Sequence, residues 1–298
     1  MIATLSANCG PHQVGGRTAQ EEFSDSRVVN LIEASCNGDR DAIARSLKAG
    51  ADPNGKGRAG DTPLFWALDC RNAVGMQALL EAGADPNYVI PAHFSATYAA
   101  SGAEDTELLR LLLKFGGNPN ASASDAPLET ALGRAFQLGF HTGNWANYYA
   151  LLDAGANINR GDDAGGTIAT LAASFGQFDK VEELLKRGYD YDLVDLGAFV
   201  QPHSAHVAPA RRRIMDMLEA KGVQFPIPAR ASMYSGRVTM RSDRSVYVVY
   251  WSGRTATGEV VHGRSENLKP GQPGYDEILR KVGGLRPGYG VGIPRTLE

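Results

Sequence analysis

One short string returns five times along the chain, and it constrains the fold more than any other feature. It reads Gly-Ala-Asp-Pro-Asn in its first two copies, which begin at Gly50 and Gly83. The related strings Gly-Gly-Asn-Pro-Asn, Gly-Ala-Asn-Ile-Asn and Gly-Tyr-Asp-Tyr-Asp begin at Gly116, Gly155 and Gly188. The spacings between the five copies are 33, 33, 39 and 33 residues. A period of this length indicates a repeat architecture, in which each unit buries its apolar face against its neighbours.

The second unit shows what each repeat contains. Thr62 is suited to cap a helix, and Pro63 to occupy its first position, where the missing N–H costs nothing. Apolar residues then recur with helical spacing in two runs: Leu64, Ala67 and Leu68, then Met76, Leu79 and Leu80. Gly83 ends the second helix where a left-handed backbone is needed, and the Asp-Pro-Asn that follows favours a turn.

The opening Thr-Pro-Leu-Phe-Trp-Ala at residues 62–67 resembles the Thr-Pro-Leu-His-x-Ala start of the ankyrin repeat, with Phe65 in place of the usual His. The terminal glycine lies 21 residues after this start, and the same offset links Val29 to Gly50, Ser95 to Gly116 and Thr167 to Gly188. The resemblance covers about residues 28–225. It implies a mainly α fold, an ankyrin-repeat solenoid of about six repeats, each made of a turn and two antiparallel helices.

Two units depart from this pattern. In the fourth, which we take to start at Ala126, the terminal Gly155 lies 29 residues after the start instead of 21, so eight residues are extra. We predict that these residues, around 137–144, form a longer turn between the two helices. The sixth unit, roughly residues 200–222, is degenerate. Its second helix is expected to act as a cap and carries Arg212, Ile214, Met215 and Leu218.

The ends of the chain lack the repeat. Residues 1–27 are polar and contain glycine, so we expect a flexible lead-in. Residues 226–298 carry 11 Lys and Arg against 6 Asp and Glu, a net charge of +5, which leaves −8 for the rest of the chain. The pattern there predicts a small β-meander plus one helix, over residues 237–241, 245–251, 257–262 and 275–282. We expect this module to pack on the last repeat, because so short a segment has a marginal core of its own.

The sequence does not predict an export signal or a membrane span. No stretch approaches the roughly 20 apolar residues of a transmembrane helix. The segment before Cys9 is similar to the end of a lipoprotein signal, but Asn8 and the lack of a basic start argue against that function. We expect a cytoplasmic location for the chain as written, with a periplasmic location as the alternative if the start is truncated.

Residues with chemistry to offer are scattered. Cys36 and Cys70 fall late in successive first helices, and their spacing favours small buried residues over a disulfide or redox pair. His203 and His206 could share a helical face, but no acidic or cysteine residue stands nearby to complete a metal site. We therefore expect no enzyme activity, no metal and no cofactor.

A binding surface is the more informative expectation. The resemblance implies that turn tips and the outer sides of first helices line a groove. We expect the following residues to contact a partner: Phe65, Trp66, Asp69, Tyr88, Ile90, Phe94, Tyr98, Glu129, Arg134 and Asp162. Trp66 fills a variable position of the ankyrin start and is expected to point outward. For Phe65, Ile90 and Phe94 the alternative is packing between repeats or tips, and for the acidic residues it is simple solvation.

Together these features favour a non-catalytic protein that binds and inhibits another protein. The leading hypothesis is a bacterial immunity protein that neutralises a toxic effector, such as a secreted lipase of a type VI secretion system. The alternative is a general ankyrin scaffold or stress-response accessory protein. Neither hypothesis involves nucleic acid.

Overall fold

The computed structural model describes residues 13–124, 129–161, 166–202, 208–227, 234–241, 243–250, 253–254, 260–261, 263–285, 287 and 290–294. By contact the chain divides into two compact units. The first comprises residues 1–124 and 128–156, and the second comprises residues 125–127 and 157–298. The sequence-based boundary at residue 226 lies inside the second unit. The fold is mainly α, with small antiparallel sheets.

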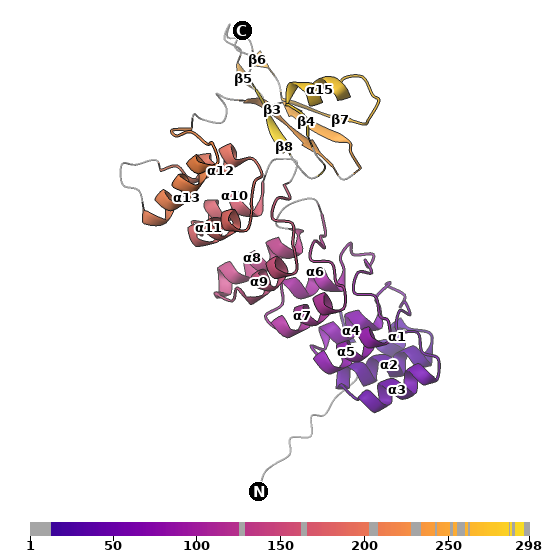
Figure 1. The fold of residues 1–298 in the computed structure, drawn as a ribbon. Helices are drawn as coiled ribbons and strands as arrows, with labels where there is room; N and C mark the ends of the chain where they lie inside the picture. Colours follow the sequence, from indigo (N-terminus) through magenta and orange to yellow (C-terminus); the bar gives the residue numbers. More distant parts are fainter. Residues whose placement is uncertain are drawn as a thin grey trace. The chain divides into compact units, whose positions relative to one another are not determined.

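Helices follow one another in pairs through the first unit (Figure 1). The pairs are α2 (Ser26–Asn37) with α3 (Arg40–Lys48), α4 (Pro63–Asp69) with α5 (Ala73–Glu81), α6 (Ala96–Ser101) with α7 (Thr106–Lys114), and α8 (Ala131–Thr142) with α9 (Ala146–Asp153). Each pair contacts the next: α2 packs on α4, α4 on α6, and α6 on α8. The two helices predicted for the second repeat are confirmed as α4 and α5, with Thr62 as the N-cap of α4 and Pro63 in its first turn.

The glycine, the aspartate and the last asparagine of the recurring string each have a structural role. Its leading glycine has a positive φ in all five copies, between 84° and 95°, a conformation that favours glycine. In the second copy the Asp85 carboxylate accepts a hydrogen bond from the Asn87 backbone N–H at 2.8 Å, which closes the turn.

The last residue of the string links one repeat to the next. Asn87 donates to the Gly116 carbonyl at 2.9 Å and accepts from the Asn118 N–H at 2.7 Å. Asn54 makes the same pair of bonds to Gly83 and Asp85, each at 2.8 Å. The period of the sequence therefore reflects a ladder of side-chain bonds between successive turns.

The extra residues of the fourth repeat extend its first helix. We predicted a longer turn at residues 137–144, but α8 continues to Thr142 and ends at Gly143, whose φ is +76°. The helix is held by an aromatic cluster in which Phe136 packs edge-on against Trp145, with ring centroids 5.4 Å apart. Gly139 is required there because a Cβ at its position would overlap the Trp145 ring. The prediction of a turn is therefore wrong, since buried packing along α8 favours continued helix.

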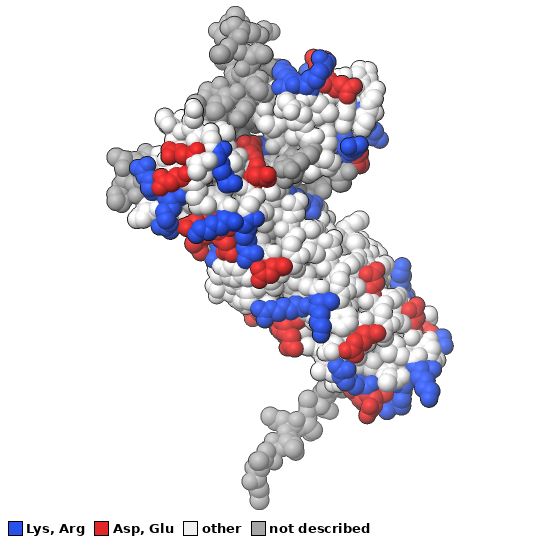
Figure 2. Space-filling view, in the orientation of Figure 1, with Lys and Arg blue, Asp and Glu red and all other residues white. Residues whose placement is uncertain are grey.

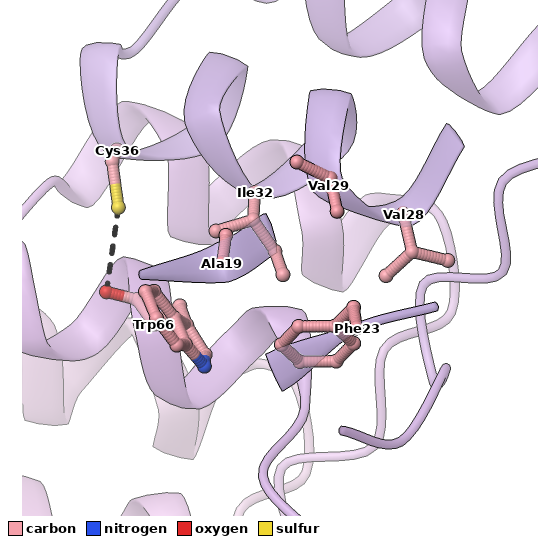
Figure 3. Packing of buried hydrophobic residues seen from close by; sticks show 7 residues of the cluster. All are labelled: Ala19, Phe23, Val28, Val29, Ile32, Cys36 and Trp66. Atoms are coloured by element: carbon pink, nitrogen blue, oxygen red, sulfur yellow. Dashed lines mark hydrogen bonds between the residues drawn. The ribbon is translucent and has the colours of Figure 1, made fainter. Parts of the chain in front are cut away.

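Residues 13–23 are folded onto the first helix pair, although the sequence placed them in a flexible lead-in. They form a hairpin of β1 (Gln13–Val14) and β2 (Arg17–Thr18), followed by α1 (Ala19–Glu22). Phe23, which follows α1, is buried and lies edge-on to Trp66 with ring centroids 6.0 Å apart. Figure 3 shows these two rings beneath the α2 side chains of the same apolar cluster.

A disulfide joins the first two helix pairs. Cys36 at the end of α2 is bonded to Cys70 at the end of α4, with Cα atoms 5.3 Å apart. The expectation of two separate small residues is therefore wrong. The Cys36 sulfur also lies 3.6 Å from the Trp66 carbonyl oxygen (Figure 3). In the disulfide this sulfur has no S–H, so the contact is a close approach and not a hydrogen bond. The helical packing that brings the two positions together could not be judged from spacing alone.

The second unit continues with helix pairs. They are α10 (Ile168–Ser174) with α11 (Phe178–Lys186), and α12 (Leu193–Val200) with α13 (Pro209–Ala220). Helix α13 buries Ile214, Met215 and Leu218, as the predicted last helix requires. In the described part of the chain, no helix has both the length and the apolar character that a membrane crossing demands.

The C-terminal module is a four-stranded antiparallel sheet with strand order β7-β4-β3-β8. Its strands are β3 (Tyr234–Met240), β4 (Val246–Tyr250), β7 (Arg264–Leu268) and β8 (Gly290–Pro294), and a separate ladder pairs β5 (Gly253–Arg254) with β6 (Val260–Val261). Helix α15 (Tyr275–Lys281) packs Tyr275 and Ile278 against the apolar core of this sheet. The predicted third strand at 257–262 contains the short strand β6, but the neighbour of β4 in the main sheet is β7, which was not predicted, and neither was the glycine-rich β8.

A buried arginine connects this sheet to the helices of the same unit. Arg237 in β3 is 2% exposed and donates to the Asp192 carboxylate at 3.1 Å and the Tyr191 hydroxyl at 2.9 Å. Asp192 in turn caps the N-terminus of α12. The module is therefore joined by an ion pair and a hydrogen bond to the segment just before α12, at the start of the last helix pair on which we expected it to pack.

Candidate partner-binding groove

The structure buries most of the aromatic residues that we expected to be exposed. Trp66 is 0% exposed, Tyr98 4% and Phe65 9%. The prediction that Trp66 points outward is wrong, because Phe23 and α2 enclose the indole in an apolar cluster. Trp66 therefore supports the first two helix pairs and is not available to a partner.

Three of the predicted aromatic residues, from the second and third repeats, do lie close together. The Phe94 ring lies 6.0 Å from the rings of both Phe65 and Tyr98, measured between centroids. Phe65 lies on α4, Tyr98 on α6, and Phe94 on the turn that precedes α6. Phe94 is half-buried and Ile90 is buried, so this turn contributes apolar surface inward rather than to solvent.

These side chains form one wall of a cavity, which we call the aromatic groove. It has a volume of about 430 Å³ and includes four of the predicted site residues: Phe65, Asp69, Ile90 and Phe94. Leu68 and Ala99 add apolar surface from α4 and α6. The volume lies near the lower end of the range for ligand sites in proteins, about 300–1,000 Å³.

The N-terminal hairpin adds residues from outside the repeats to the lining. Val14 and Arg17 both line the aromatic groove. The Arg17 guanidinium bonds to the Glu22 carboxylate at 2.6 Å and to the Asp61 carboxylate at 3.3 Å. Burial raises the pKa of Asp61, Arg17 opposes that shift and Glu22 adds to it. One arginine therefore serves two buried carboxylates, and the cluster keeps a net negative charge.

Tyr98 belongs to a second polar group beside the aromatic residues. Its hydroxyl donates to the Glu129 carboxylate at 2.8 Å, and the Arg134 guanidinium lies 4.9 Å from the centre of its ring. Burial raises the pKa of Tyr98, and the bond to Glu129 acts in the same direction. Glu129 and Arg134, which we predicted as contact residues, are thus brought to one place by Tyr98.

The other predicted residues are more dispersed. Tyr88 is half-buried under the Lys56 ammonium, which lies 4.4 Å from its ring centre. This contact and the approach of Pro91 to Gly60 show that adjacent turns pack on each other. Asp162 lies outside the described residues.

Sequence reasoning missed the part of the site that comes from outside the repeats. Val14 and Arg17 flank Gly15-Gly16, a dipeptide typical of a two-residue hairpin, so a local signal was present. Leu68 stands three residues after Phe65 and shares its helical face, a spacing that also could have identified it. The reach of Arg17 to Asp61, across 44 residues, had no sequence signal.

The described residues offer little chemistry apart from binding. Within them, no cluster of three His, Cys, Asp or Glu side chains could hold a metal ion. On the face shown in Figure 2, acidic and basic side chains are interspersed over the first unit, and they form no extended patch of one sign there.

Residues 59–90 match the family model of the ankyrin repeat. The match spans α4, α5 and the start of the turn that carries Phe94, so it includes the lining residues of the aromatic groove from Asp61 to Ile90. It supports an ankyrin-repeat protein, and ankyrin repeats are typically non-catalytic modules for protein–protein interaction. No curated protein matches the chain.

Proposed function

We propose that this chain binds a partner protein through the aromatic groove, on an ankyrin solenoid of about six repeats. The single observation that carries the proposal is the groove itself, where Phe65, Ile90 and Phe94 form an apolar surface beside the carboxylates of Asp61 and Asp69. Apolar side chains gathered with charged groups at a rim are the usual anatomy of an interface.

In its finer form, the proposal is that binding inhibits the partner. A bacterial immunity protein that neutralises a toxic effector, such as a secreted lipase, fits a chain in which a groove is combined with a separate C-terminal module. The buried Arg237–Asp192 pair fastens this module to the helices of its own unit, so the module is ordered before a partner binds. The alternative is a general scaffold or stress-response accessory protein, which would bind without changing its partner's activity.

The Cys36–Cys70 disulfide bears on where the chain works. Disulfides persist in oxidising compartments, such as the bacterial periplasm, and are rare in the reducing cytosol. We therefore favour the periplasmic alternative over the cytoplasmic location expected from the sequence.

Affinity capture from the native host tests the proposal, with the immobilised full chain as bait. The expected result is one protein enriched at near-stoichiometric amounts, whose enzymatic activity falls when the purified chain is added. A captured protein whose activity is unchanged by saturating amounts of the chain supports the scaffold alternative. Failure to retain any protein on the wild-type chain contradicts the proposed function.

A further inference from the structure

We propose that the aromatic groove is an anchor pocket that takes one large apolar side chain of the partner, with a Lys or Arg next to it in the partner's sequence. This inference rests on the proposed function and names the chemistry of its partner. It follows from three properties of the groove: an apolar floor, a charge imbalance, and a well-attached hairpin in its lining.

The floor of the groove is preformed. Phe65 and Ile90 are buried, and Phe94 is held between the Phe65 and Tyr98 rings, so these side chains lose little freedom when a partner binds. Leu68 and Ala99 are half-buried and complete the apolar surface. A volume of about 430 Å³ suits one or two large side chains and is too small for a whole packed helix.

The charges around this floor favour a cation. Asp61, Asp69 and Asp105 line the groove together with Arg17 and Arg71, and Glu22 shares Arg17 with Asp61. Four carboxylates against two guanidiniums leave a net charge of −2. Asp69 is exposed on the last turn of α4, where a cation from the partner can reach it.

The N-terminal hairpin is firmly attached where it lines the groove. Val14 faces the groove, and Arg17 fastens the hairpin to Glu22 and Asp61. The main chain adds a further attachment, because the Arg58 N–H donates to the Glu22 carbonyl at 2.9 Å. The part of the lining that the hairpin contributes is therefore held in place before a partner binds, which favours insertion of a side chain into a preformed pocket.

A phage library of random 12-residue peptides, panned on the immobilised full chain, tests the inference. The expected result is enrichment of peptides that carry Phe, Trp, Leu or Met next to Lys or Arg. Leu68→Arg, which places a charge on the floor, should weaken a selected peptide at least tenfold, whereas Asp69→Lys should remove the preference for a basic neighbour and weaken binding roughly fivefold to tenfold at low salt. Asp216→Lys, an exposed carboxylate on α13, is the matched control and should change nothing.

Each other outcome has a defined meaning. Selected peptides that lack the basic residue, or that bind Leu68→Arg and Asp69→Lys as tightly as wild type, overturn the anchor pocket but leave protein binding intact. A library that yields no enriched peptide also overturns the anchor pocket, and host capture then decides the proposed function separately. Because Asp69 is exposed, its variant keeps the test valid if Leu68→Arg fails to fold.

Discussion

Reduction of the Cys36–Cys70 disulfide should destabilise the first unit by an amount that its loop length predicts. The two cysteines are 34 residues apart. In the chain-entropy description, a cross-link that closes 34 residues lowers the free energy of the folded state relative to the unfolded state by about 3.8 kcal/mol at 25 °C. Chemical reduction leaves both sulfur atoms in place, so it changes the cross-link without creating a cavity.

Urea unfolding with and without a phosphine reductant measures this quantity. The transition of the first unit should move to lower urea in the reduced chain, by roughly 1–2 M if its m-value is about 2–3 kcal/mol/M. A thiol titration of the urea-unfolded, unreduced chain should find one free thiol of the three cysteines, namely Cys9. Three free thiols, or an unchanged urea midpoint after complete reduction, would refute the reasoning.

Three further perturbations test other parts of the account. Arg237→Met should lower the free energy of unfolding of the second unit by about 3–5 kcal/mol, because it leaves Asp192 without its cation, while the exposed Arg212→Met should have little effect in the same urea titration. Asn87→Ala removes two bonds between successive turns and should cost about 1–2 kcal/mol by thermal or urea unfolding; no loss would contradict the ladder. Because the folded-state pKa of Asp61 is raised, the folded chain binds a proton more tightly than the unfolded chain, and acid favours folding at this group. The stability of Asp61→Asn relative to wild type should therefore fall as the pH is lowered toward the ordinary carboxyl pKa of about 4, and a rise would contradict the assigned burial.

The repeated string made much of the helical region predictable. A turn needs a residue that tolerates positive φ, and the glycine of each string marks that position without ambiguity. Apolar residues at helical spacing then located α4 and α5 on either side of a short break. These signals are local, so they can be recognised in the sequence without knowledge of the tertiary structure.

Features that depend on contacts between distant residues were harder to predict. Trp66 has the spacing of an outward position, yet Phe23 from a segment outside the repeats covers it. The strand β8 is rich in glycine and has low intrinsic β-propensity, so its pairing with β3 decides its conformation. Arg17 reaches the aromatic groove only because the N-terminal hairpin folds back, a contact that no repeat period encodes.

The affinity of the host-captured partner for wild type and Leu68→Arg, compared by titration calorimetry, tests the central claim most directly. The account predicts a tight complex with the wild-type chain and a loss of at least about 30-fold with Leu68→Arg, since an interface hot spot is worth about 2 kcal/mol or more. Asp216→Lys should bind like wild type. Equal affinity for wild type and a folded Leu68→Arg would contradict the claim that the aromatic groove is the binding site.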